Sequence, residues 1–193
     1  LGNRARGPEG TKPGAIRRVQ ISNVTVKNAD PRYPSIIAGL PGHPIEDVRI
    51  SNVHIEHRGG LTLEQVAQQP ANLVNTFFLR GAGLTGPRDP FIPPEQEKAY
   101  PEPSMFGLLP AHAFYVRHAK NLVVRDLTVR FLAADTRPAV VLDDVTGATF
   151  DGVALQRGAG APAFVLRQVK DFSVRASPGI PEQQRTTADN ESL

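Results

Sequence analysis

The 193-residue sequence has no cysteine, no tryptophan and one methionine, and it contains no apolar run near the length that a membrane span needs. The absence of cysteine excludes disulfide bonds, thiol nucleophiles and thiolate metal sites, although it does not fix the cellular compartment. No contact with a membrane is expected. The first residues, Leu1-Gly2-Asn3, include neither an initiator methionine nor a signal peptide. We therefore expect a trimmed chain, whose native compartment is unknown from the sequence.

The sequence also has no large excess of positive or negative charge. Lysine and arginine number 22 and aspartate and glutamate 19, which gives a formal net charge of +3. The arginines are distributed along the chain and form no basic run, so no nucleic-acid partner is expected. Hydrophobic residues make up 40% of the chain and charged residues 21%, proportions typical of a globular domain with a packed core.

What the sequence does contain is an internal repeat of apolar residues. With Φ for an apolar residue and x for any residue, the frame is Φ-x-x-Φ-x-Φ-x-x-Φ-x-Φ. Its copies begin at Ile16, Ile45, Ala119, Val145 and Val169 and run to Val26, Ile55, Val129, Leu155 and Val174, the last copy being incomplete. A polar or turn dipeptide such as Ser51-Asn52 divides each full copy, and Asn tolerates a left-handed backbone. Short strands of period two, kinked every few residues, are typical of β-structure and not of helices.

The spacing of the copies predicts the architecture. The third apolar position recurs after about 24 to 29 residues, with one longer interval between Ile50 and Val124. A period of this length that contains only strands and bends favours a β-solenoid, in which each turn pairs with the turn above it. A leucine-rich repeat would need a Leu-x-x-Leu-x-Leu-x-x-Asn frame, and a propeller blade would need a period of about 40 residues.

A further apolar strand precedes each of the three late copies, at 114–118, 140–144 and 164–168. Each turn then holds three strands, which is the cross-section of a right-handed parallel β-helix. The predicted fold class is therefore all-β, a parallel β-helix or solenoid. Ile21, Ile50, Val124 and Phe150 are all expected to point into one continuous core.

Two segments do not carry the repeat. Residues 57–113 are expected to form one long inserted loop, with a short helix at 63–67 and an irregular proline-rich stretch at 87–110, and to fold over one side of the solenoid. Residues 178–193 are polar, lack the apolar frame and are expected to form a mobile tail. The predicted division is therefore 1–177 for the β-helix and 178–193 for the tail.

Several segments outside the apolar frame resemble a known family. They are 28–33 (Asn-Ala-Asp-Pro-Arg-Tyr), 39–48 (Gly-Leu-Pro-Gly-His-Pro-Ile-Glu-Asp-Val), 100–107 (Tyr-Pro-Glu-Pro-Ser-Met-Phe-Gly), Leu109-Pro110-Ala111, Arg117-His118 and 137–144 (Arg-Pro-Ala-Val-Val-Leu-Asp-Asp). Together they resemble the C-terminal region of bacterial members of glycoside hydrolase family 28, the polygalacturonase family. The resemblance covers about Gly14 to Ala176, with His112-Ala113 where similar proteins would have Tyr-Gly.

The resemblance implies the same β-helix fold and the hydrolysis of α-linked galacturonan or related pectic chains with inversion. It also implies four catalytic motifs in a fixed order: Asn-Thr-Asp, Asp-Asp, Gly-His-Gly and Arg-Ile-Lys. Here Asn75-Thr76 is followed by Phe77, Gly42-His43 is followed by Pro44, and Asp143-Asp144 lies too late in the chain. No catalytic residue is therefore predicted, and the catalytic set is expected upstream of the first residue. Asp143-Asp144 is expected to be a solvated turn pair.

What the resemblance leaves to this chain is the substrate-facing wall. His43 lies near the place of a cleft residue in the family and could hydrogen-bond a sugar hydroxyl or a uronate, with a structural turn histidine as the alternative. Arg32 and Tyr33 could supply a carboxylate clamp and a stacking ring, or belong to a plain surface loop. Tyr100 lies in the proline-rich stretch, where packing of the loop is the alternative.

No metal site and no cofactor are expected. His54 and His57 are separated by two residues on strand-like sequence, so they point to opposite faces, and no third ligand is near. A polysaccharide lyase would need a calcium-binding cluster of carboxylates with a basic residue, and the sequence contains no such cluster.

Two function classes remain. The first is the C-terminal portion of a pectin-type glycoside hydrolase, which contacts an acidic polysaccharide or oligosaccharide and is inactive alone; by resemblance its compartment is periplasmic or extracellular. The second is a non-catalytic carbohydrate-binding or structural β-helix module. In either case the first copy, from Ile16, has no polar cap before it, so self-association through this end is expected.

Overall fold

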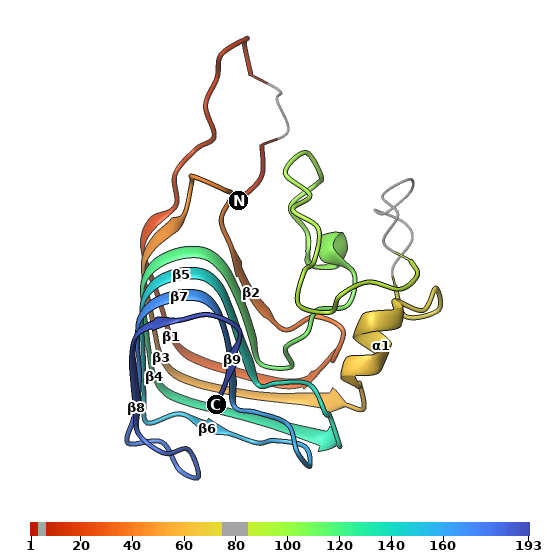
Figure 1. The fold of residues 1–193 in the computed structure, drawn as a ribbon, viewed down its shortest axis with the longest axis vertical. Helices are drawn as coiled ribbons and strands as arrows, with labels where there is room; N and C mark the ends of the chain where they lie inside the picture. Colours follow the sequence, from red (N-terminus) through yellow and green to blue (C-terminus); the bar gives the residue numbers. More distant parts are fainter. Residues whose placement is uncertain (4–6, 75–84) are drawn as a thin grey trace.

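The computed structural model describes residues 1–3, 7–74 and 85–193, and these residues are mostly β-structure (Figure 1). The strands are β1 (Arg17–Ala29), β2 (Ser35–Ala38), β3 (Ile45–Gly59), β4 (Phe114–Ala133), β5 (Val140–Asp151), β6 (Ala154–Leu155), β7 (Phe164–Arg175), β8 (Gln183–Ala188) and β9 (Glu191–Ser192). Between β3 and β4, the described residues form two short helices, α1 (Leu63–Gln68) and the 3-10 helix η1 (Pro103–Phe106). Neither is long and apolar enough to cross a membrane.

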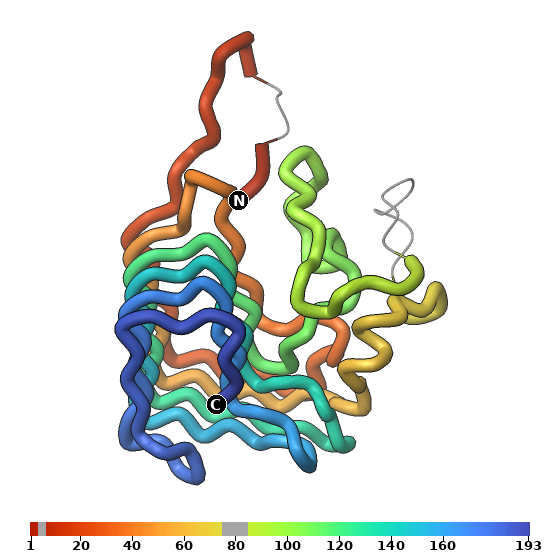
Figure 2. The backbone as a smooth tube through the Cα atoms, viewed as in Figure 1, coloured from red at the N-terminus to blue at the C-terminus, as the bar shows by residue number. Residues whose placement is uncertain are grey.

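The strands form one open, mostly parallel sheet in the order β1-β3-β4-β5-β7-β8. The long strands are bent, and Figures 1 and 2 show them nested one behind another. The copies of the repeat are neighbours in register: Ile21 pairs with Ile50, Ile50 with Val124, and Val124 with Phe150. The all-β prediction and the pairing of consecutive copies are confirmed at this level.

The bends have the backbone conformation that the sequence predicts. Asn23, Asn52 and Asp126 have positive φ angles of 57°, 52° and 51°, in the left-handed region that Asn and Asp tolerate. At one bend the side chains also pair, because Asn52 Nδ2 donates to Asn23 Oδ1 at 2.7 Å. These single left-handed residues turn each strand without ending it, so a bent strand such as β4 continues past each bend.

The core lies inside the bends. Ile50, Val124 and Phe150 are buried there as predicted, and the rings of Phe150 and Phe164 have centroids 4.9 Å apart. The prediction is wrong for Ile21, which is 42% exposed. The reason is its position at the edge: among the described residues, β1 pairs with β3 alone, so Ile21 has an apolar neighbour strand on one side only.

The opposite edge is covered, which contradicts the expectation of a mobile tail at 178–193. Strands β8 and β9 both pair antiparallel with β7. Leu193 adds to this cover, since its N–H donates to the Phe164 carbonyl at 2.9 Å and its carbonyl accepts from Ala163 N–H at 2.7 Å. Ala188 is buried against the core. Polar sequence does not prevent this pairing, because the backbone supplies the hydrogen bonds.

The inserted segment begins after Gly59, where β3 ends, and reaches Ala113; we call residues 60–113 the excursion. Helix α1 lies where a helix was expected and starts with a capping box between Thr62 and Gln65. The helix η1 was not expected, and its position follows from Glu102, which caps it, and Pro103, which occupies its first position.

The excursion packs on the outer face of the short sheet segment formed by β2 and the first residues of β4, β5 and β7. Tyr115, Val141 and Val165 point outward there and form an apolar cluster with Met105, Phe106 and Leu109 of the excursion. This arrangement explains why β4, β5 and β7 each start with three consecutive apolar residues, since both faces of the sheet are buried there. The outer face of this segment is therefore covered.

Candidate functional site

A groove of about 550 Å³ lies between the segment around β2 and the excursion. Its lining includes Tyr33, Ile36, Ala38, Glu102, Met105 and Phe106. The two sides come from parts of the chain that are distant in sequence and meet because β2 lies beside β4, under the excursion. Two aromatic rings and mostly aliphatic walls suit the apolar face of a sugar ring or another flat ligand.

The carboxylate of the groove is already engaged. Glu102 accepts a hydrogen bond from Ser104 N–H at 3.0 Å and a short one from the Ser104 hydroxyl. This carboxylate therefore serves as the cap of η1. Burial raises the pKa of the Tyr33 phenol, so this side chain stays neutral at physiological pH and can both donate and accept a hydrogen bond.

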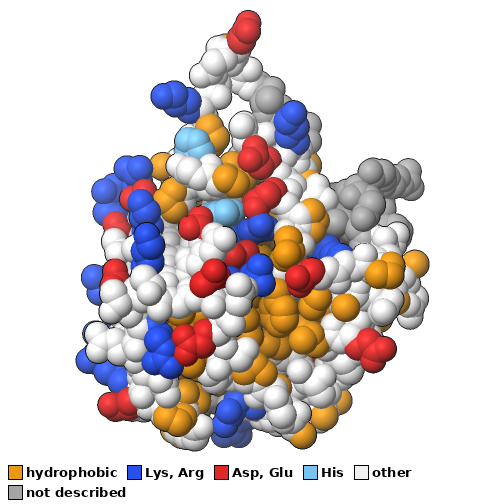
Figure 3. All heavy atoms as spheres, in the orientation of Figure 1, with side chains coloured by type: hydrophobic (Ala, Val, Ile, Leu, Met, Phe, Trp, Pro, Cys, Tyr) orange, Lys and Arg blue, Asp and Glu red, His pale blue; other side chains and the backbone are white. Residues whose placement is uncertain are grey.

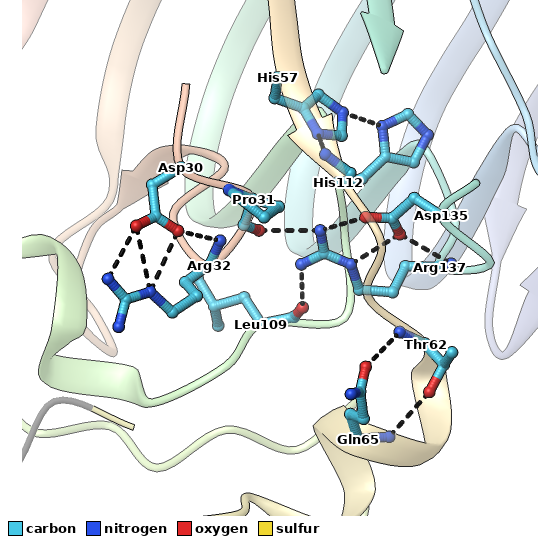
Figure 4. A network of polar contacts seen from close by, with 11 residues as sticks. Asp30, Pro31, Arg32, His57, Thr62, Gln65, Leu109, His112, Asp135 and Arg137 are labelled. Atoms are coloured by element: carbon cyan, nitrogen blue, oxygen red, sulfur yellow. Dashed lines mark hydrogen bonds and ion pairs between the residues drawn. The ribbon is translucent and has the colours of Figure 1, made fainter. Parts of the chain in front are cut away.

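Arg32 does not present an open carboxylate clamp. Its Nε lies 3.0 Å from Asp30 Oδ1 and its Nη2 lies 2.7 Å from Asp30 Oδ2, so the planar fork is filled by a carboxylate of the same loop (Figure 4). The side-chain hydrogen bond from Arg32 holds the pKa of Asp30 below its usual value. The Arg32 guanidinium carbon lies 5.2 Å from the centre of the Tyr33 ring. Arg32 thus lies beside the Tyr33 ring, and its partner Asp30 is one of the residues that sequence reasoning missed.

The other two candidate residues have different positions. His43 closes a tight turn, in which its N–H donates to the Leu40 carbonyl at 2.8 Å and Leu40 N–H donates back at 3.0 Å. It is not among the residues that line the groove. Tyr100 is more than half exposed and directly precedes Pro101, which lines the groove. The structure therefore brings Tyr33 together with the segment that follows Tyr100, with Arg32 beside Tyr33.

A cluster of charges lies at the edge of the excursion. Glu95 of the excursion forms a short ion pair with Arg117, and its carboxylate oxygen Oε2 is 3.2 Å from His118 Nε2. The other His118 nitrogen, Nδ1, lies 2.6 Å from Asp144 Oδ2. On the face drawn in Figure 3, acidic and basic side chains gather beside an exposed apolar area. These contacts connect the excursion to the bends of β4 and β5.

Two carboxylates of the sheet each lie between two arginines of neighbouring strands. Asp143 is 3.5 Å from Arg117 and 4.0 Å from Arg167. In the same way Asp151 lies between Arg125 at 4.0 Å and Arg175 at 2.9 Å. The parallel register produces both columns, because it places equivalent residues of consecutive copies side by side.

The prediction that Asp143 and Asp144 form a solvated turn pair holds for Asp144 and fails for Asp143. Asp144 is exposed at a bend, with a φ angle of 52°, as expected of a solvated turn residue. Asp143 is not solvated, since its side chain is mostly buried. Burial raises the pKa of Asp143 in spite of the two flanking arginines. The sequence held a signal for this difference, because Asp143 continues the period-two outward row of its strand and Asp144 does not.

Below the excursion lies a fully buried ion pair, Asp135–Arg137. Arg137 Nη2 is 2.8 Å from Asp135 Oδ2, and both side chains are completely inaccessible to solvent. The same guanidinium donates to the Pro31 carbonyl at 2.8 Å and to the Leu109 carbonyl at 3.2 Å (Figure 4). One arginine therefore fixes the loop before β2 and the end of the excursion to the loop before β5.

Beside this ion pair lie two buried histidines. His57 Nδ1 accepts from Gly59 N–H at 3.2 Å, so its proton is on Nε2, which lies 3.2 Å from His112 Nδ1 (Figure 4). The His112 proton must then be on Nε2, an atom with no hydrogen-bond partner in the described part of the chain. Burial lowers the pKa of both imidazoles, and that of His112 to about 3.

Because of the two buried histidines, we expect the protein to lose stability in mild acid. Their pKa values are lower in the folded chain than the usual 6.5, so the unfolded chain binds more protons below that pH. The contribution of the two neutral histidines to the free energy of unfolding should be fully present above about pH 6.5. It should fall as the pH decreases toward 3, by up to about 1.4 kcal/mol per pH unit for His112. Urea unfolding between pH 7 and pH 4 measures this slope.

The variant His112→Phe should flatten that slope, because the group that takes up the proton on unfolding is gone. His54→Phe is the matched control, since His54 is exposed on the same strand as His57. It leaves the buried pair intact and should keep the slope of the wild type. Equal slopes for the wild type and His112→Phe would show that His112 does not cause the acid sensitivity.

No group of three His, Cys, Asp or Glu side chains in the described ranges could hold a metal ion. The partial motif Asn75-Thr76 lies outside the described residues. Comparisons with protein-family models, with curated proteins and with solved structures found no match for this chain.

Proposed function

We propose that this chain forms C-terminal turns of a right-handed parallel β-helix of the pectin-type glycoside hydrolases, and that it binds an acidic oligosaccharide without hydrolysing it. The β-helix is supported by consecutive copies of the repeat that pair in register and by the left-handed residues at each bend. The binding role is supported by one observation above all. The groove joins Tyr33, from one of the segments that resemble the family, to the segment 101–106, from another.

In this role the ring of Tyr33 stacks on a sugar, because Arg32, held by Asp30, lies beside the ring and the opposite wall of the groove contains Phe106. The aromatic rings of the groove suit the flat face of a sugar ring, and the acidic character of the proposed ligand comes from the resemblance to the family.

The chain alone is proposed to lack turnover. Inversion requires an acid and a base about 6.5–9.5 Å apart on the two sides of the scissile bond. The carboxylate in the groove, that of Glu102, is bound to Ser104, and Asp143 is held between arginines and does not line the groove. A non-catalytic carbohydrate-binding module remains the second candidate, and it is favoured by the same engaged carboxylates.

The test is calorimetric titration with a short oligogalacturonate, together with a reducing-sugar assay. Binding without release of reducing ends is expected, and Tyr33→Ala should weaken binding about tenfold, the effect of one lost stacking ring. Leu132→Ala is the control, because Leu132 is exposed at the end of β4 and does not line the groove.

Absence of binding by the wild type would refute the proposed ligand. Release of reducing ends that disappears in Asp143→Asn or Asp144→Asn would show that these carboxylates are catalytic after all. Binding of a neutral oligosaccharide with the same affinity as oligogalacturonate would favour a general carbohydrate-binding module over the pectin-type reading.

A further inference from the structure

The charges that face the groove decide which form of a uronic acid can enter it. A uronic acid residue carries its carboxyl group either as a free carboxylate or as a neutral methyl ester. A carboxylate that leaves water needs a cation or hydrogen-bond donors in place of its hydration shell, whereas an ester needs much less. The side chains along the groove can therefore distinguish the two forms.

No cationic side chain of the described residues lines the groove. Arg32 directly precedes Tyr33 but is not part of the lining, and its Nε and Nη2 already donate to Asp30. The same carboxylate of Asp30 also lies 3.1 Å from Nη2 of Arg58. A ligand carboxylate beside Tyr33 would therefore find no guanidinium fork open to it within the described part of the chain.

The charged side chain that does line the groove is negative. It is Glu102, whose carboxylate accepts hydrogen bonds from the backbone N–H and the hydroxyl of Ser104. Its charge is felt at the phenol of Tyr33: burial is the main cause of the raised pKa of this phenol, and the negative charge of Glu102 adds to it. A ligand carboxylate beside Tyr33 would be repelled by the same charge.

Much of the remaining lining is aliphatic and suits a methyl group. Ile36 and Ala38 of β2 form one side of the groove, and Met105 of η1 belongs to the other. A thioether side chain such as that of Met105 adapts its shape to small apolar groups. An ester methyl group that enters here is removed from water against apolar surface, which is favourable. A charged carboxylate in the same place would lose its hydration and gain no partner.

We propose, resting on the function proposed above, that the uronic acid residue held in the groove carries its carboxyl group as a methyl ester. The oligosaccharide as a whole stays acidic where its other residues lie outside the groove and keep their carboxylates. Stacking on Tyr33 does not distinguish the two forms, because both present the same sugar ring. The distinction comes from the charge of Glu102 and from the aliphatic walls.

Calorimetric titration of the 193-residue chain with tetragalacturonate and with its methyl ester tests the proposal. The ester should bind about tenfold more tightly at low salt. This ratio should shrink as the salt concentration rises, because salt screens the repulsion between Glu102 and the free acid. Glu102→Gln should strengthen binding of the free acid about threefold and change binding of the ester less than about twofold. Glutamine keeps an oxygen that can accept from Ser104 N–H, so the cap of η1 is retained.

Glu64→Gln is the matched control, since it makes the same change in charge at an exposed residue of α1 that does not line the groove. It should leave both affinities unchanged, and Tyr33→Ala should weaken both ligands by the same factor. Equal affinity for the two forms, or tighter binding of the free acid, would overturn the ester and leave the proposed function standing. Equal binding of the ester and of maltotetraose, a neutral glucan, would also overturn it. Lack of binding by either form would refute the proposed function itself, and the ester with it.

Discussion

Replacing Ile50 by Asp should abolish cooperative folding of the chain at neutral pH. The side chain of Ile50 is 4% exposed and lies in register between Ile21 and Val124 in the core. An aspartate there loses the apolar contacts of isoleucine and leaves an unpaired carboxylate in a site without hydrogen-bond donors. The expected loss exceeds about 4 kcal/mol, which is a large part of the 5–15 kcal/mol that typically stabilises a domain.

The register supplies a matched control one strand away. Ile21→Asp makes the same chemical change at the position that pairs with Ile50, but this side chain is 42% exposed and a carboxylate can reach water there. We expect a loss of about 1 kcal/mol or less. Urea unfolding followed by circular dichroism compares the two. Similar midpoints for the two variants would show that Ile50 does not lie in a continuous core.

The second large effect is expected at Arg137. Arg137→Met removes one partner of a fully buried ion pair and leaves Asp135 without its counter-charge. Burial by itself raises the pKa of the Asp135 carboxyl, and in the intact protein the hydrogen bonds from Arg137 hold that pKa below its usual value. Breaking such a pair from one side costs about 3–5 kcal/mol. The carbonyls of Pro31 and Leu109 lose a donor as well.

The loss at Arg137 should be largely recovered when Asp135 is also replaced, because no charge then remains buried. The double variant Asp135→Leu/Arg137→Met is therefore expected to be more stable than Arg137→Met alone. Arg175→Met provides the surface control, since Arg175 pairs with Asp151 while more than half exposed, and about 0–1 kcal/mol is expected. A double variant as unstable as the single one would locate the effect in the carbonyl contacts and not in the buried carboxylate.

The repeat could be predicted from sequence because its determinants are local. Apolar residues of period two define each strand, and a left-handed Asn or Asp such as Asn52 defines each bend, so both can be found within a few residues. The register followed from aligning the copies, which is why the neighbours of Ile50 were correct. Helix α1 was found for the same reason, since its capping box is local.

The candidate site depends on contacts that no local pattern encodes. Arg137 binds a carbonyl 106 residues away, and Glu95 reaches the bend at His118 from the middle of the excursion. Whether Arg32 is open to a ligand depends on Asp30, whose side chain folds back onto it. Strand β8 was missed because its pairing with β7 requires backbone groups and not an apolar frame.

The two columns of alternating charge restrict how the number of repeats can change. Both columns have the order arginine, aspartate, arginine: Arg117, Asp143 and Arg167 in one, Arg125, Asp151 and Arg175 in the other. Loss of the middle copy by unequal recombination would bring two pairs of arginines into register at about 4.8 Å. Duplication of a single copy would likewise place equal charges side by side. Gain or loss of two adjacent copies preserves the alternation, so this part of the molecule can grow or shrink in steps of two more readily than in steps of one.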